Sequence, residues 1–193
     1  MGHRGGKDEA SASGARQTGG VRYLIVVRHA SAEDPEPGRG DFERALTKKG
    51  RRQCARLRAW AEDPAALGRF GPVTAVVSAA ARTRQTFERG FAGTSLVAES
   101  FESVALYNGR RHVSVEDVVV ELVAHDAAGR SLLVVGHNPT VREVVDVLGL
   151  GVPLSREGWF PKGGAVVLEL ADGRPIGTGG HRCVGFFDPT AAD

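Results

Sequence analysis

Three short runs of aliphatic residues constrain the fold of this chain more than any other feature of its sequence. The runs are RYLIVV (22–27), VTAVVS (73–78) and SLLVVG (131–136). Apolar runs without alternation are typical of strands that are buried on both faces of a sheet. Stretches with helical periodicity lie between the runs, and strands that alternate with helices favour βαβ units. We therefore predict an α/β fold, a three-layer α/β/α sandwich with a mainly parallel central sheet.

Four segments have the pattern of helices that could cover such a sheet. Thr47 and Ser114 are in N-cap positions, and Asn138 followed by Pro139 is a further helix start. The four predicted helices span 46–63, 80–91, 114–125 and 138–149. Three more short strands are predicted at 95–99, 164–170 and 181–187.

Length and composition set limits on the class of protein. With 193 residues the chain is long enough for one domain, which we expect to span 21–193. Residues 1–20 are rich in Gly, Ser and charge and are expected to form a disordered N-terminal tail. The net charge is +2 and only 6% of residues are aromatic, without the basic, aromatic-bearing stripe of a nucleic-acid binder.

The cysteines and the lengths of the apolar runs bear on the cellular location and on cofactors. Two cysteines without zinc-ligand spacing indicate neither a disulfide framework nor a metal site, so we expect a reducing cytoplasmic location. No apolar run is long enough for a membrane span, and we expect no signal peptide, metal or other cofactor. The sequence leaves the oligomeric state open.

Arginine and histidine side chains follow the three aliphatic runs. Arg28 and His29 follow the first run, Arg82 and Arg84 lie shortly after the second, and His137 follows the third. Ligands of parallel sheets bind outside the carboxyl ends of the strands, so these side chains should converge at one edge. Guanidinium groups match phosphate oxygens, and an imidazole can attack phosphorus and hold it covalently. Neighbouring arginines would disfavour the imidazolium and keep a ring lone pair available.

Four ordered motifs resemble those of the histidine phosphatase superfamily, the phosphoglycerate-mutase-like enzymes. The motifs are VVRHASAED, DFERALTKKGRRQ, VSAAARTRQT and LLVVGHNP. VALYNG also resembles an element of the small bacterial branch that removes phosphate from phosphohistidine on signalling proteins. The resemblance runs from about residue 22 to residue 170.

Carried over by position, the resemblance implies a role for each matched residue. His29 would be the nucleophile, and Arg28, Arg82 and His137 would bind the phosphoryl oxygens. Arg44 would be a further phosphate or substrate contact. Arg84 does not match the family arginine and is expected to be a surface charge. Gln85 and Thr86 are expected to pack and cap rather than react.

The general acid is the part of the motif set in which this chain departs from its relatives. Asn138 stands where phytase-like relatives carry an Asp, and Glu102 is the nearest candidate for the mutase-like acid. A weak or absent acid favours a phosphoramidate, because the imidazole that leaves phosphohistidine is protonated with little help. The sequence also has no long insertion that would cover the site, which suits a phosphorylated protein as substrate.

Three functions remain open at this point. The first is a phosphatase with a phosphohistidine intermediate that acts on phosphohistidine of a signalling protein. The second is a phosphomonoesterase or mutase for a small phosphorylated substrate, and in that enzyme Glu102 should matter. The third, of another class, is a catalytically silent phosphate-recognition domain.

Overall fold

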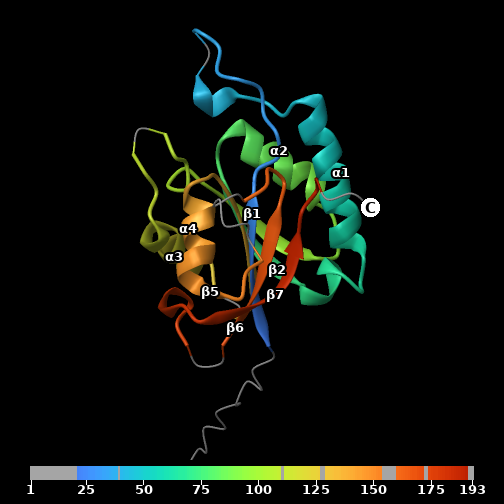
Figure 1. The fold of residues 1–193 in the computed structure, drawn as a ribbon, viewed down its shortest axis with the longest axis vertical. Helices are drawn as coiled ribbons and strands as arrows, with labels where there is room; N and C mark the ends of the chain where they lie inside the picture. The colour runs from blue at the N-terminus through green and yellow to red at the C-terminus, as the bar shows by residue number, and fades with distance from the viewer. Residues whose placement is uncertain are drawn as a thin grey trace, which may run out of the picture.

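A seven-stranded sheet runs through the centre of the molecule, in the order β3-β2-β4-β1-β6-β7-β5 (Figure 1). The computed structural model describes residues 21–38, 40–109, 111–126, 129–153, 160–171 and 174–190. The strands are β1 (Arg22–Arg28), β2 (Val73–Ser78), β3 (Val97–Ser103), β4 (Ser131–Gly136), β5 (Gly149–Leu150), β6 (Ala165–Leu170) and β7 (His181–Phe187). The neighbours β3, β2, β4 and β1 pair in parallel, whereas β6 is antiparallel to both β1 and β7.

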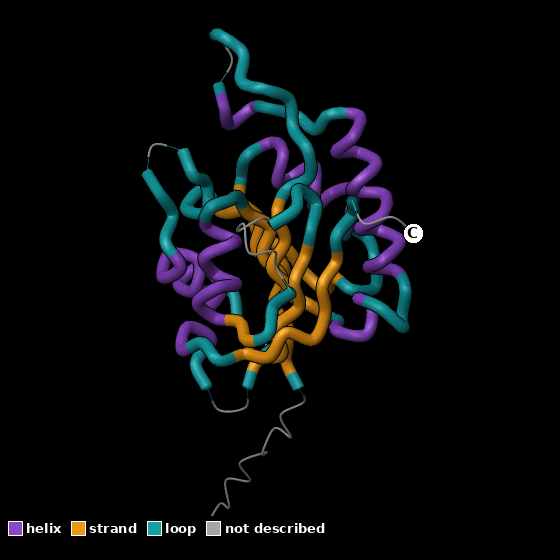
Figure 2. Tube along the Cα trace, viewed as in Figure 1, coloured by secondary structure: helices purple, strands orange, loops and turns teal. Residues whose placement is uncertain are grey.

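Two pairs of helices cover the two faces of the sheet and complete three layers (Figure 2). The helices are α1 (Lys48–Glu62), α2 (Ala81–Gly90), α3 (Val115–Ala124) and α4 (Thr140–Leu148). Leu57 of α1 and Phe87 of α2 pack on one face, in a cluster with Val77 of β2. Leu122 of α3 packs on the other face, together with α4. The predicted α/β/α sandwich with a mainly parallel sheet is confirmed.

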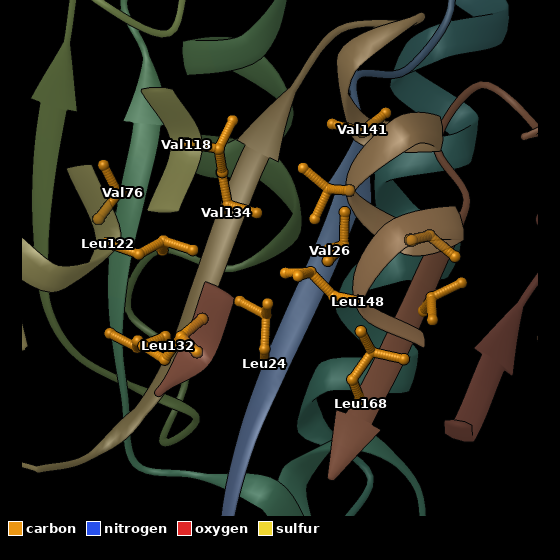
Figure 3. Packing of buried hydrophobic residues seen from close by; sticks show 14 of the residues in the cluster. Leu24, Val26, Val76, Val118, Leu122, Leu132, Val134, Val141, Leu148 and Leu168 are labelled. Atoms are coloured by element: carbon orange, nitrogen blue, oxygen red, sulfur yellow. The ribbon is translucent and has the colours of Figure 1, made fainter. Parts of the chain in front are cut away.

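The apolar strands have the burial that their sequences predict. Leu24, Val26, Leu132 and Val134 are buried between the sheet and the α3–α4 layer (Figure 3). The alternate residues of the same strands, such as Ile25, are buried towards α1 and α2. Both faces of β1 and β4 are therefore inside the molecule, which explains why neither strand alternates between apolar and polar residues.

The starts of the helices agree with the sequence in two cases and differ in a third. Thr47 caps α1 by accepting a hydrogen bond from the Gly50 amide, and Ser114 forms a capping box with Asp117. Asn138 was predicted as the N-cap of the fourth helix and Pro139 as its first residue, but α4 begins one residue later, at Thr140. Pro139 is the residue before the helix, and no side chain caps it there.

The edge strand β3 is longer than its sequence predicts. The prediction covered 95–99, whereas β3 spans Val97–Ser103 and most of its residues are exposed. Its backbone pairs with β2 in parallel up to Ser78↔Ser103. Pairing with a buried neighbour, rather than an apolar pattern of its own, therefore extends this strand.

Two further expectations concern the ends of the chain and the membrane. The predicted strand at 181–187 is confirmed as β7. The predicted disordered tail, 1–20, lies outside the described residues. In the part of the chain that is described, no helix combines the length and apolarity needed to cross a bilayer.

Candidate active site

The carboxyl ends of β1, β2 and β4 meet at one edge of the sheet and bring two histidines together. The register pairs Arg28 at the end of β1 with Gly136 at the end of β4, so the next residue of each chain segment is a histidine. The His29 amide donates a hydrogen bond to the Gly136 carbonyl, 3.0 Å away. The rings of His29 and His137 lie with their centroids 5.2 Å apart.

His29 has one ring nitrogen held by the backbone and the other left for chemistry. Its Nδ1 lies 2.8 Å from the Ala30 carbonyl oxygen, which only an N–H can satisfy. Nδ1 therefore carries the proton in the neutral ring, and Nε2 keeps its lone pair. The pKa of His29 is lowered to about 3, mainly by burial, and the positive charges of Arg82 and Arg28 act in the same direction. The ring is neutral near pH 7, as a nucleophile requires.

His137 is also buried and neutral. Its Nε2 lies 2.9 Å from the Ser78 hydroxyl at the end of β2. Burial lowers the pKa of His137 to about 2, and the neighbouring His29 and Arg82 contribute in the same direction. Its Nδ1 is buried and has no hydrogen-bond partner among the described residues. This nitrogen is available for an oxygen of a bound anion.

Arg28 at the end of β1 and Arg82 in the first turn of α2 are each anchored through part of the guanidinium group. Arg28 donates from Nη1 to the Phe160 carbonyl. Arg82 is only 4% exposed and donates from Nη1 to the Asp41 carbonyl at 2.7 Å. Arg82 Nε is buried without a partner among the described residues. A buried donor of this kind is costly unless an acceptor reaches it, so it marks a place for an anion.

A polar cavity of about 450 Å³ contains these groups. Arg28, His29, Arg44, Arg82 and His137 all line it, so five of the six site residues predicted from sequence lie in one place. The imidazole and guanidinium groups come from segments that are far apart in the chain. Three strand ends and the loop before α1 build the cavity together.

Arg44 reaches the cavity from that loop and is fixed by the chain around it. Its Nη1 donates to the Glu33 carbonyl at 2.7 Å, and its Nε donates to Asp41 Oδ1 at 2.7 Å. Arg44 thus faces the same space as Arg82, with Asp41 between the two cations.

Asp41 is a site residue that the sequence analysis missed. Its Oδ2 accepts hydrogen bonds from Arg82 Nη2 at 3.0 Å and from the Tyr107 hydroxyl at 2.8 Å. Burial alone would raise the pKa of Asp41, but the Tyr107 hydrogen bond and the charges of Arg82 and Arg44 outweigh it and lower the pKa. The carboxylate is therefore ionised near neutral pH. The sequence did contain a signal for Asp41, because this residue lies in the motif DFERALT together with the predicted site residue Arg44.

Tyr107, Asn108 and Lys162 complete the cavity and were not predicted either. Asn108 donates to the Thr140 hydroxyl at the start of α4 and accepts from the Val113 amide, which holds the loop over the site. Lys162 precedes Gly163, whose amide donates to the backbone carbonyls at the end of β1. The motifs VALYNG and KGG contain these residues, but neither indicates by itself that its segment folds back over β1.

Glu102 and Arg84 lie elsewhere. The β2–β3 register pairs Glu102 with Val77, so both side chains lie on the α2 face of the sheet. There Glu102 lines a separate pocket with Arg84 and Phe87, and neither Glu102 nor Arg84 lines the cavity of the two histidines. The predicted catalytic position of Glu102 thus does not join the other site residues.

Gln85 and Thr86 support the site through hydrogen bonds. Thr86 Oγ1 accepts from the Ala30 amide at 3.0 Å, and Gln85 Oε1 accepts from the Leu46 amide at 2.9 Å. Both contacts tie α2 to the loops that carry His29 and Arg44. This agrees with the expectation that these residues pack and cap.

A metal ion has no evident set of ligands in the described part of the chain. No group of three or more His, Cys, Asp or Glu side chains is placed there to hold one. The positive charges that surround the cavity come from guanidinium and ammonium groups.

Comparison with known proteins finds solved structures that share the fold of this chain. No protein-family model and no curated protein matched the sequence. A solved structure from Nakamurella multipartitia, described as a proposed phosphohistidine phosphatase SixA, is 28% identical with a TM-score of 0.68, covering 89% of this chain and 98% of that one. A second, from Agrobacterium tumefaciens and described in the same way, is 26% identical with a TM-score of 0.67, covering 87% of this chain and 99% of that one.

A third structure has the same fold at lower identity. It is the protein histidine phosphatase SixA in complex with tungstate, 21% identical, with a TM-score of 0.66, covering 86% of this chain and 97% of that one. All three structures are covered almost completely, so the similarity extends over the whole sheet and both helical layers.

Proposed function

We propose that this chain is a member of the histidine phosphatase superfamily, like the solved structures that it resembles, and that it removes the phosphoryl group from phosphohistidine of a protein, through a phosphorylated His29. One observation carries the proposal. The Ala30 carbonyl holds the proton on Nδ1 of His29, and this leaves the Nε2 lone pair in a cavity lined by Arg28, Arg82 and other cations.

The reaction would proceed in two in-line displacements. In the first, His29 Nε2 forms a bond to phosphorus while the bond from phosphorus to the substrate imidazole breaks, and that imidazole takes a proton from solvent. In the second, water attacks the phosphohistidine, releases inorganic phosphate and restores the neutral ring. Arg28, Arg82 and His137 would stabilise the charge on the phosphoryl oxygens in both steps.

The carboxylates that line the cavity are poor proton donors, and this favours a phosphoramidate over an ester as the substrate. Asp34 and Asp41 are the described carboxylates that line it. Asp34 is exposed, and the lowered pKa of Asp41 makes it a poor proton donor. An alkoxide leaving group needs a proton from a placed acid, whereas an imidazole with a reference pKa of about 6.5 takes one from water. The reaction that the cavity supports best therefore has a nitrogen leaving group.

A rapid-quench experiment tests this function. Protein labelled on phosphohistidine with ³²P is mixed with an excess of enzyme, and the label on the enzyme is measured after brief reaction. We expect a transient, acid-labile and alkali-stable label on the native chain and none on His29→Ala. Hydrolysis of sugar phosphates at a far greater kcat/KM than of the phosphohistidine protein would overturn the proposed substrate.

Arg82 and Arg84 offer a matched pair for the same assay. Removal of one oriented charge from a transition state typically costs 10²–10³ in kcat, so we expect a loss of about that size for Arg82→Ala. Arg84 lies in another pocket two residues away. Arg84→Ala should therefore keep kcat within about twofold, and equal losses in the two variants would contradict the assignment of Arg82.

A further inference from the structure

A row of exposed cations covers the first half of α1. Five of the nine residues 48–56 are Lys or Arg and are exposed to solvent. They are Lys48, Lys49, Arg51, Arg52 and Arg56. We call these five residues the α1 basic face.

This arrangement is unfavourable for the helix itself. Cations near a helix N-terminus oppose the helix dipole, and the first turn of α1 has no acidic residue. Like charges three or four positions apart, such as Lys48 with Arg52 or Lys49 with Arg52, also repel one another. In the described part of the chain, no carboxylate forms an ion pair with Lys48, Lys49 or Arg52. These three cations therefore have no ionic partner among the described residues.

The basic face is hollowed as well as charged. A depression of about 290 Å³ lies between α1 and the segment that follows β7. Lys49, Arg52 and Arg56 line it on one side, and Pro189 and Thr190 on the other. Arg56 donates to the Pro189 carbonyl at 2.6 Å, so the two walls are joined. A depression of this size can take an acidic side chain between cations.

The helix that carries the basic face is joined to the loop that follows His29. Gln53, on the same helix, accepts a hydrogen bond from the Ser31 amide at 2.8 Å, and the Thr47 amide donates to the Ser31 carbonyl at 3.0 Å. Ser31 is two residues beyond His29. Figure 1 shows α1 starting at the edge of the sheet where β1 ends. A protein that presents a phosphohistidine to His29 can therefore also touch α1.

We propose that the α1 basic face is the docking surface for an acidic surface of the phosphohistidine-bearing protein. The inference rests on the proposed function and adds the chemistry of the partner. The exposed cations Lys48, Lys49 and Arg52, which have no ion pair among the described residues, would attract a partner with several Asp or Glu residues near its phosphohistidine. Specific recognition would thus depend on α1, and the chemistry on the cavity.

Two synthetic phosphohistidine peptides test the docking surface. One carries four Glu residues beside the phosphohistidine, and the other carries four Gln residues at the same places. We expect the native chain to hydrolyse the Glu peptide with a kcat/KM at least tenfold above that of the Gln peptide. In Lys49→Glu/Arg52→Glu this preference should disappear, while the Gln peptide is hydrolysed within about twofold of the native rate.

A control variant separates docking from net charge. Arg174→Glu/Arg182→Glu makes the same change in charge at exposed positions near the turn between β6 and β7, at the opposite edge of the sheet. It should keep the preference for the Glu peptide. If both double variants lose the preference equally, the effect comes from the overall field and the docking surface is refuted.

Direct binding measures the docking surface separately from catalysis. Fluorescence anisotropy with the unphosphorylated peptides should show that the native chain binds the Glu peptide at least tenfold more tightly than the Gln peptide. The variant Lys49→Gln/Arg52→Gln should bind the two peptides with equal affinity. Turnover of neither peptide together with this binding pattern would remove the proposed function alone. Equal binding by the native chain would refute the docking surface, as would tighter binding of a DNA or RNA oligonucleotide of the same charge.

Discussion

Asp41 has surroundings that its sequence context does not indicate. It lies in an acidic loop that contains Pro and Gly, yet its carboxylate contacts Arg82, Arg44 and Tyr107. A carboxylate in this place orders two guanidinium groups before substrate arrives. It also occupies donors that a phosphoryl group would use, so substrate and Asp41 compete for the same cations.

The competition predicts the effect of Asp41→Asn. Removal of the negative charge should strengthen binding of inorganic phosphate, roughly tenfold in the inhibition constant, because repulsion between two anions is lost. Competitive inhibition by phosphate measures this directly. Weaker phosphate binding in the variant would show instead that Asp41 acts mainly to hold Arg82 in position.

For Glu102, in contrast to Asp41, we expect that substitution has little effect on the site. Its side chain lies on the α2 face, in a pocket apart from the histidines. Glu102→Gln should therefore leave kcat and KM within about twofold for a phosphohistidine substrate and for a phosphate ester. A loss of tenfold or more on the ester alone would restore the role of Glu102 as the acid of an esterase.

At the scale of elements, the join between β1 and α1 positions the nucleophile. Gly50, in the first turn of α1, passes so close to the loop after β1 that a Cβ there would lie 2.0 Å from the Ser31 carbonyl oxygen. The Thr47 side chain donates to the same carbonyl at 3.1 Å. The segment Leu-Thr-x-x-Gly is therefore needed for a close approach of helix and loop, two residues from His29.

Gly50→Ala should destabilise the protein and disturb the site. Overpacking of this kind costs about 1–3 kcal/mol, and the shift of Ser31 should also lower kcat. Urea unfolding measures the first effect. Gly40→Ala is the matched control, since a Cβ at Gly40 meets nothing within 4 Å and its φ of −64° suits alanine. Equal midpoints for the two variants would contradict the importance of the close approach.

At the scale of the whole molecule, the fold keeps two imidazoles neutral inside a cluster of cations. His29 is 9% exposed and His137 is 3% exposed, and their pKa values are lowered to about 3 and about 2. In the unfolded chain both rings would take up protons near pH 6.5. The unfolded state therefore binds more protons than the folded state below that pH, and stability must fall as the pH falls.

The sign and size of this dependence can be measured. Between pH 7 and pH 5, each ring that titrates only when unfolded should cost about 2 kcal/mol of unfolding free energy. Urea unfolding at the two pH values gives the total. In His29→Gln one titrating ring is gone, so the loss should shrink by about 2 kcal/mol. An unchanged loss would mean that the pKa of His29 in the folded protein is not lowered.

The sequence alone determined the layers of this protein and the chemical character of its site. Burial on both faces makes strands such as 22–27 and 131–136 continuously apolar, and capped amphipathic helices such as 46–63 lie between them. Both signals are local, and so are Arg28, His29 and His137 directly after the strands. For the same reason Arg82, in the first turn of its helix, could be placed at the site in advance.

Only the tertiary structure decided which loops close over that edge of the sheet. Asp41 and Tyr107 are 66 residues apart, and their hydrogen bond depends on how two irregular segments fold back over the strand ends. Glu102 was misplaced because the pairing of β3 with β2, which no local pattern encodes, sets the face on which its side chain lies. Strand burial is written into short stretches of sequence, whereas the meeting of distant loops is a property of the packed molecule.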